Sequence, residues 1–250
     1  MLKSCFLAAF LLPMPAVCHA QHTIEIKHTF YTNLFDTVQC SEIQGFYIQT
    51  SAHAAISLDK TNPKHIERKG VYASFKKDPG APKHCLLKYP SSYTGYNKQY
   101  DKTDLQHRVD KGHVNPFEAM AFDETAALES MYYTNVCPQI SYFNEHQWEQ
   151  VEMHVVKDIS VRYGDVKVWT GVLISNSHPK KVGDLMMPDW YWKVIEYTKD
   201  GQMVQEAWMG RNDSTNTSTK PAAIVTTASH LDTVIHKYYH DFAIGWTKTH

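Results

Sequence analysis

The sequence predicts an α+β fold in which helices flank a central, mainly antiparallel sheet. Two strand-like segments, residues 189–198 and 202–210, are separated by a Lys-Asp-Gly turn, which is the pattern of a β-hairpin. Four apolar residues recur at helical spacing: Trp148, Val151, Val155 and Ile159. This stripe indicates an amphipathic helix. At 250 residues the chain is long enough for one domain with a sizeable core.

The N-terminal half is expected to contain strands, long loops and one helix. Residues 23–32 (TIEIKHTFYT) alternate as a strand does, and residues 45–59 indicate one or two further strands. Residues 61–104 are rich in Lys, Pro, Gly and Tyr, which favours loops around short strands such as 70–75 (GVYASF). Residues 122–133 combine leading acidic residues with apolar helical spacing, so a short helix is expected there.

The C-terminal half has clearer periodicity. The amphipathic helix is expected over residues 141–163, with Gly164 as its end. Residues 166–175 (VKVWTGVLIS) have the composition of a buried strand, and the predicted hairpin follows. A final helix is expected to be capped by Ser229 and to run to Tyr239.

Residues 1–20 have the pattern of a secretory signal peptide. Lys3 precedes an apolar run at residues 5–12, and small residues precede a cleavage site after Ala20. The apolar run is too short to span a bilayer as a helix. The alternative to a signal peptide is therefore a helix that is buried in the folded domain. We expect residues 21–250 to form a single exported domain, secreted or periplasmic, that is not inserted in a membrane.

Export determines how the cysteines are interpreted. Cys40, Cys85 and Cys137 remain after the predicted cleavage, and an oxidising compartment favours one disulfide among them. Three pairings are open. We expect Cys40–Cys85, because both residues lie in the irregular N-terminal half, with Cys137 as a buried thiol.

Charge is unevenly distributed along the chain. Residues 60–111 contain twelve Lys and Arg against five Asp and Glu, a local charge of +7. Residues 112–165 contain two basic and nine acidic residues, a local charge of −7. A basic block next to an acidic one suits a polyanion groove beside a cation site, although two solvated faces would give the same counts.

Residues 107–116 (HRVDKGHVNP) concentrate two histidines, an arginine, a lysine, an aspartate and an asparagine around one glycine. A neutral His113 has the chemistry of a general base, although a lone histidine before Asn-Pro is often structural. In the predicted helix, Asn144 and Glu152 lie eight residues apart, about 80° around the axis, so both can face one cleft.

Two motifs resemble the DNA/RNA non-specific endonuclease family, which has a ββα-metal active site. The family motif Asp-Arg-Gly-His corresponds to Asp110-Lys111-Gly112-His113. The second motif matches at six positions: Asn135, Pro138, Gln139, Asn144, Trp148 and Glu152. The spacing of both motifs, together with the strands at 166–175 and 189–198, extends the resemblance over about residues 100–210.

The resemblance implies a role for each matched side chain. His113 would act as general base on the attacking water, and Asn144 would be the direct ligand of one Mg²⁺ ion, with Mn²⁺ as an alternative. Glu152 would hold waters around the metal, and Asn135 would position the loop or these waters. The resemblance implies an endonuclease whose partners are DNA and RNA, and the predicted signal peptide makes it a secreted one.

Lys111 departs from the family pattern. Arginine grips phosphate with a planar, bidentate fork, whereas lysine retains only the charge. We expect retained activity and consider Arg108, three residues earlier, as a second substrate-binding cation.

Two other functional classes are open. The chain would be a non-catalytic, secreted nucleic-acid- or polyanion-binding relative if Lys111 marks lost activity, or an adhesion domain if the match is accidental. Because some members of the family form dimers, a homodimer is a further alternative.

Four tyrosines among the lysines would either stack on unpaired bases or anchor loops: Tyr89, Tyr93, Tyr96 and Tyr100.

Overall fold

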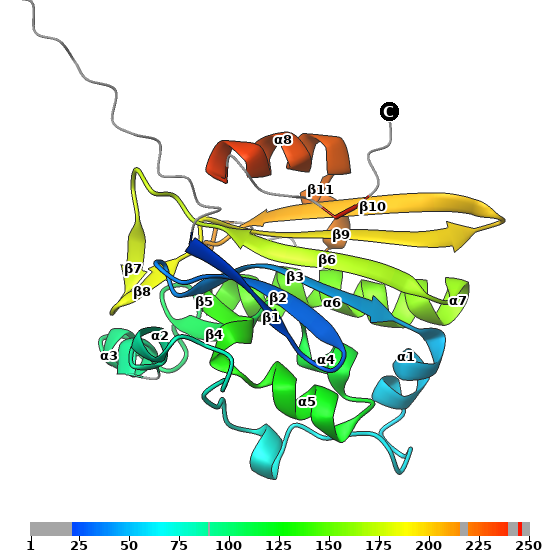
Figure 1. The fold of residues 1–250 in the computed structure, drawn as a ribbon, viewed down its shortest axis with the longest axis horizontal. Coiled ribbons are helices and arrows are strands. Elements are labelled where there is room, and N and C mark those ends of the chain that lie inside the picture. Colours follow the sequence, from blue (N-terminus) through cyan, green and yellow to red (C-terminus); the bar gives the residue numbers. More distant parts are fainter. Residues whose placement is uncertain (1–21, 90, 216–219, 240–244, 247–250) are drawn as a thin grey trace, which may run out of the picture.

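The computed structural model describes residues 22–89, 91–215, 220–239 and 245–246. A seven-stranded sheet forms its centre (Figure 1). Its strands, in spatial order, are β1 (Thr23–Lys27), β2 (Tyr31–Asp36), β3 (Ser41–Gln49), β6 (Val166–Leu173), β9 (Trp190–Lys199), β10 (Gln202–Arg211) and β11 (Val225–Thr226). Every neighbouring pair is antiparallel, which confirms the predicted α+β class.

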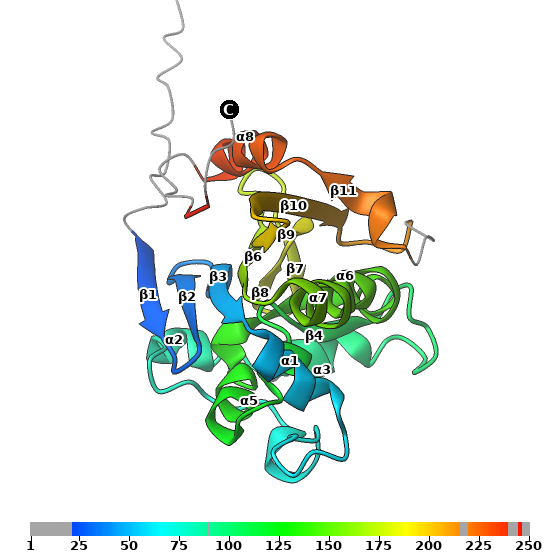
Figure 2. The same cartoon turned by 90° about the vertical axis from the view of Figure 1, so that its right-hand side faces the viewer.

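Helices cover both faces of this sheet (Figures 1 and 2). On one face lies α8 (Ala228–Tyr238), and on the other lies a long helix over residues 141–163. The core is accordingly divided. Tyr191 and Ile195 of β9 belong to the cluster beneath the long helix, whereas Trp192 and Val194 belong to the cluster beneath α8. A strand buried on both faces explains the nearly continuous apolar sequence of β9.

Short elements complete the fold around the long helix. The helices are α1 (Ser51–Leu58), α2 (Lys83–Leu86), α3 (Ser91–Asn97), α4 (Phe117–Met120) and α5 (Glu124–Ser130). The single-turn 3₁₀ helices are η2 (Gly70–Tyr72), η3 (Tyr133–Asn135) and η6 (Pro221–Ile224). Two further strand pairs are β4 (Val109–His113) with β5 (Val136–Ile140), and β7 (Lys180–Val182) with β8 (Leu185–Met187).

Three local expectations were wrong. Residues 45–59 are not all strand, because β3 gives way to α1, whose N-cap Thr50 accepts a hydrogen bond from the His53 amide at 3.0 Å. The expected strand at 70–75 is absent, and η2 occupies its first residues. The last helix is capped by Thr227, which accepts from the His230 amide at 3.1 Å, two residues before Ser229.

The hairpin of β9 and β10 is confirmed. Its two turn residues, Asp200 and Gly201, have φ values of 52° and 77°, as a two-residue turn of type I′ requires. The predicted helix within residues 122–133 is confirmed as α5, whose N-cap Asp123 accepts from two backbone amides. Among the described residues, no helix combines the length and apolar character needed to cross a bilayer. The predicted signal peptide, residues 1–20, lies outside the described residues.

A disulfide joins Cys40 to Cys85, the pairing expected from the sequence, and Cys137 is a buried free thiol. Cys40 lies in the turn before β3 and Cys85 lies in α2, so the bond fixes the basic N-terminal loops to the edge region of the sheet. The two cysteines are 45 residues apart and fully buried.

Replacing both disulfide cysteines by serine is expected to lower the free energy of unfolding by about 4 kcal/mol, the loop-closure value for this separation. Urea denaturation of the oxidised proteins measures the change. Cys137→Ala is the control, because it removes a thiol without opening the loop. An unchanged urea midpoint in the double variant would show that the disulfide does not support the fold.

Candidate active site

The strands β4 and β5 and the helix that follows them form a ββα unit. In the antiparallel register, His113 lies opposite Val136, and Gly112 lies opposite Cys137. A Cβ atom on Gly112 would lie 2.0 Å from Gln139 Oε1, so only glycine fits this position of the motif. The tight pairing places His113 at the end of β4 and leads the chain directly from β5 into the helix.

Asp110 of β4 orients the predicted metal ligand. Its carboxylate accepts a hydrogen bond from Asn144 Nδ2 at 2.9 Å and another from Ser141 Oγ at 2.9 Å. Asn144 is half-buried, and its Oδ1 has no hydrogen-bond donor among the described residues. With the amide nitrogen held by a carboxylate, the oxygen is left as the free ligand atom.

The helix departs from regular geometry at this point. Residues Phe143–Trp148 and His154–Ser160 are π-helical, with the α-helical segments α6 (Glu149–Met153) between them and α7 (Val161–Tyr163) after them. The 100° rotation per residue assumed from the sequence therefore does not apply between Asn144 and Glu152. Wider π turns occur often at functional sites, where they change the direction of one side chain.

His113 is almost buried, with 9% of its surface exposed. Its Nε2 atom is buried and has no hydrogen-bond partner. The ring of Phe75 lies 5.1 Å from the imidazole, centroid to centroid. Burial, with a further contribution from the positive charge of Arg68, lowers the pKa of His113 to about 3. The imidazole is therefore neutral at physiological pH, as a general base must be.

Arg68 is a site residue that the sequence did not single out. Its guanidinium carbon lies 5.7 Å from the centroid of Phe75, and Lys111 Nζ lies 5.5 Å from the same ring. His113 packs against this ring as well, so two cations and the candidate base surround one phenylalanine. Neither cation has a carboxylate within 4.0 Å in the described part of the chain. Burial, opposed by Asp110 and assisted by Arg68, lowers the pKa of Lys111.

Glu152 lies in α6, two turns after Asn144. One of its carboxylate oxygens, Oε1, is buried without a hydrogen bond. Burial raises the pKa of Glu152, and the ammonium of buried Lys193 opposes that rise. Burial likewise lowers the pKa of Lys193, whose Nζ donates to Thr170 Oγ1 at 3.1 Å. Glu152 thus faces the interior beside a cation and has an oxygen left for a further ligand.

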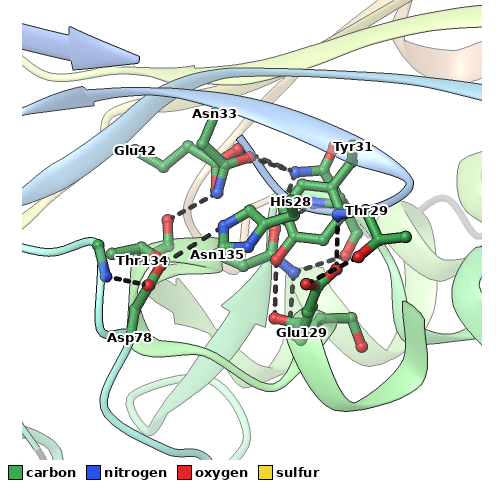
Figure 3. Close-up of polar contacts among 12 residues, drawn as sticks. His28, Thr29, Tyr31, Asn33, Glu42, Asp78, Glu129, Thr134 and Asn135 are labelled. Atoms are coloured by element: carbon green, nitrogen blue, oxygen red, sulfur yellow. Dashed lines mark hydrogen bonds and ion pairs between the residues drawn. The ribbon is translucent and has the colours of Figure 1, made fainter. Parts of the chain in front are cut away.

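Asn135 is fully buried and supports the loop after β4. Its Oδ1 accepts from the backbone and side-chain amides of Asn115, both at 2.9 Å, and its Nδ2 donates to the carbonyls of Asn115 and Ser130. Asn115 Nδ2 also donates to Asn33 Oδ1 at 2.8 Å and Glu42 Oε1 at 3.0 Å. Figure 3 shows Asn33, Glu42 and Asn135 converging from separate parts of the chain. Asn135 acts by positioning, because all its polar atoms are used within this network.

Arg108 does not join Arg68 at the phenylalanine. Its Nη1 atom donates to the backbone carbonyls of Asn97 and Tyr100, at 3.4 and 3.5 Å. It lines a separate cavity together with Lys111. The structure therefore brings Lys111 and His113 together around Phe75, links Asn144 to Asp110, and places Arg108 in the lining of the separate cavity.

Two antiparallel strands and a helix, carrying a histidine at the strand end and an asparagine in the first helical turns, define the ββα-metal class of nuclease fold. The DNA/RNA non-specific endonuclease family model matches residues 42–245, and the chain belongs to this family.

Relatives and solved structures agree with this assignment. Nuclease EXOG, mitochondrial, from mouse (Mus musculus) and from human (Homo sapiens) is 28% identical over 95 residues, 36% of this chain and 24% of each relative. The same nuclease from Xenopus laevis is 28% identical over 134 residues, 48% of this chain and 36% of the relative. The chain thus matches about a quarter to a third of the length of these relatives. A chain in the crystal structure of an EndoG/EndoGI complex has the same fold, with a TM-score of 0.66 and 16% identity over 91% of this chain and 86% of that one.

Proposed function

We propose that this protein is an exported, Mg²⁺-dependent endonuclease that hydrolyses phosphodiester bonds in DNA and RNA with little base preference. One observation carries the proposal: His113 Nε2 is buried without a partner on the same ββα unit on which Asp110 leaves Asn144 Oδ1 free. Family membership supports the reaction class. Backbone phosphates, which carry no sequence information, suit the unpaired cations Arg68 and Lys111.

The donor set fits a magnesium ion. Magnesium prefers oxygen ligands and keeps several waters, so a site with one protein ligand is sufficient. Asn144 Oδ1 would be that ligand, and Glu152, with its unpartnered Oε1, would hold surrounding waters. Mn²⁺ would fit the same oxygens. The bound cation would supply positive charge that stabilises the charge developing on the phosphate and on the leaving oxygen.

His113 would take the proton of the attacking water at Nε2. In the free protein the imidazole is a weak base, because its pKa is lowered by burial and by Arg68. A substrate phosphate between Arg68 and Lys111 would neutralise that positive potential and raise the pKa of His113 again. Substrate binding would therefore strengthen the base at the moment when it is needed.

Arg68 would supply the guanidinium that the motif lacks at Lys111. Arg68→Ala is expected to lower kcat/KM by about 10- to 100-fold, the value of hydrogen bonds to a charged group, and Arg68→Lys is expected to lose less. Initial rates on a labelled oligonucleotide measure the effect. The control is Lys69→Ala, which removes the adjacent exposed cation, paired with Glu67 at 2.7 Å. Equal rates for Arg68→Ala and Lys69→Ala would exclude this role.

Export rests on the predicted signal peptide at residues 1–20 and on the domain that we assign to residues 21–250. The Cys40–Cys85 disulfide supports it, because disulfides persist in oxidising compartments such as the periplasm or the medium. N-terminal sequencing of the protein recovered from these fractions is expected to begin at Gln21. A chain that starts at Met1 and stays in the cytosol would contradict export.

Nicking of supercoiled plasmid and degradation of total RNA by purified residues 21–250 test the activity. We expect cleavage of both with Mg²⁺ or Mn²⁺ and none with EDTA. One competing function is nucleic-acid binding without catalysis. The lysine at position 111, where the family motif has arginine, favours it. Metal-independent binding of both nucleic acids by the folded protein, without cleavage under any condition, would establish that function instead.

A further inference from the structure

A cavity of about 510 Å³ lies beside β4, next to the candidate active site. Its walls are α3, the loop that follows α3 and β4 itself, and it is widely open to solvent. Four of its lining residues are basic: Lys98, Lys102, Arg108 and Lys111. Lys111 connects the two regions, because its side chain lines the cavity and its ammonium also faces Phe75 of the active site. A ligand in this cavity would therefore be continuous with one at His113.

The positive charge of the cavity is only partly offset by carboxylates, through the electrostatic interactions of Asp110 with Lys111 and of Asp101 with Arg108. Asp110, which also lines it, is occupied by Ser141 and Asn144. Asp101 accepts from the amide and hydroxyl of Thr103, and Asp104 bonds to the His107 ring at 2.9 Å. None of the four cations lies within 4.0 Å of a carboxylate in the described ranges. Concave, unpaired positive charge favours an anion.

The cavity also has an aromatic wall. Of the four tyrosines in the basic segment, Tyr89 and Tyr93 are buried in the core, at 5% and 3% exposure, so they do act as loop anchors. Tyr100 is half-buried and lines the cavity, and its ring stacks on His107 with centroids 5.6 Å apart and an interplanar angle of 16°. The neighbouring ring of Tyr96 lies 5.5 Å away. A ring held in place on one side is a platform for a nucleobase.

We propose that this cavity binds one unpaired nucleotide adjacent to the scissile phosphate, with its phosphate against Lys98, Lys102 and Arg108 and its base against Tyr100. The inference rests on the proposed nuclease function and specifies its substrate. The volume lies within the range of small-ligand pockets, roughly 300–1,000 Å³. A base in a duplex is stacked and paired, so it would have to leave the helix to enter. Single-stranded DNA or RNA is therefore the preferred substrate class.

Kinetics with three substrates test the inference: a single-stranded 12-mer, the duplex of the same sequence, and bis(4-nitrophenyl) phosphate, a phosphodiester that contains no nucleotide. The variants are Tyr100→Ala and the double variant Lys98→Ala/Lys102→Ala. Their matched controls are Tyr100→Phe, which keeps the aromatic face, and Lys60→Ala/Lys64→Ala, which removes two exposed lysines of the basic segment that do not line the cavity.

Tyr100→Ala is expected to raise KM for the single strand by about 5- to 100-fold, the range for one stacked base, with kcat and small-diester hydrolysis unchanged. The Lys98→Ala/Lys102→Ala variant is expected to raise KM for the single strand more than for the duplex. Both controls are expected to match the wild type. Fluorescence anisotropy of the labelled 12-mer in EDTA measures the same loss as weaker binding, independently of catalysis.

Cleavage and binding of the single strand at wild-type levels by both variants would overturn the cavity inference and leave the nuclease proposal intact. An equal rise in KM for the single strand and the duplex in Lys98→Ala/Lys102→Ala would also overturn it. The lysines would then contact the backbone of any nucleic acid. Absence of cleavage of every substrate by the wild type would overturn the proposed function, whereas the anisotropy comparison would still decide whether the cavity binds an unpaired nucleotide.

Discussion

Replacing His113 by alanine is expected to lower kcat/KM for nucleic-acid cleavage by about 100- to 10,000-fold, the range for a general base. The imidazole is the buried side chain at the end of β4, and its Nε2 has no partner within the protein. Plasmid nicking and oligonucleotide rates measure the loss, with circular dichroism to verify folding. His178→Ala, at an exposed loop position, is the control. Wild-type rates in His113→Ala would remove this residue from the mechanism.

The pH dependence gives a second view of the same residue. An ordinary histidine, with a pKa near 6.5, would become protonated as the pH falls from 7 to 5. The pKa of His113 is lowered to about 3 in the free protein, so its base form persists throughout that range. The kcat/KM profile, which reports the free enzyme, is therefore expected to show no fall caused by histidine between pH 7 and 5. A protonation step near pH 6.5 that His113→Gln abolishes would contradict this expectation.

Removing the amide of Asn144 is expected to have an effect of similar size. Asn144→Ala would eliminate the direct protein ligand of the metal, and we expect cleavage at 1 mM Mg²⁺ to fall by at least about 100-fold, the upper part of the range for perturbing the surroundings of a ligand. Activity measured against Mg²⁺ concentration, together with direct titration of Mn²⁺ binding by electron paramagnetic resonance, tests the role. Unchanged Mn²⁺ binding by Asn144→Ala would place the metal elsewhere.

Asp110 allows the orientation of the ligand to be tested separately. Asp110→Ala frees the Asn144 amide and is expected to weaken Mn²⁺ binding by about 10- to 100-fold while Asn144 itself remains. Ser141→Ala removes the other hydrogen bond to the same carboxylate and is expected to change binding less than tenfold. If Asp110→Ala binds Mn²⁺ as tightly as Ser141→Ala does, Asp110 does not position the ligand.

Local sequence signals predicted several parts of this molecule correctly. The β9–β10 hairpin depends on a two-residue turn, and α5 depends on its cap and its spacing, so neighbouring residues are sufficient to specify them. Motif spacing singled out His113 and Asn144, which lie at the end of β4 and in the first turns of the helix, and their roles stay predictions. The α1 helix was missed because Thr50 was taken as part of a strand rather than as a cap.

Other features depend on tertiary contacts that sequence patterns do not contain. Arg68 was one of twelve cations in the basic segment, and only folding places it against Phe75. Asn115 and Asn33 are 82 residues apart in the network that holds the active-site loop. The π turns around Asn144 were also missed, because an apolar repeat of three and four residues is compatible with both kinds of helix.

The contribution of β2 to that network has a consequence for the order of folding. Asn33 precedes residue 42, where the family match begins, yet it donates to the carbonyl of Thr134 at 3.2 Å and accepts from Asn115. These contacts close loops of 82 and 101 residues, and contacts of this kind are intrinsically slow to form because the loop-closure entropy must be overcome first. A fragment cut at residue 42 would keep every side chain that we propose to be catalytic but not the strand that fixes their loop. Nuclease competence is thus expected to arise only at the final docking of the N-terminal hairpin, so an incompletely folded chain would carry the motif without its activity.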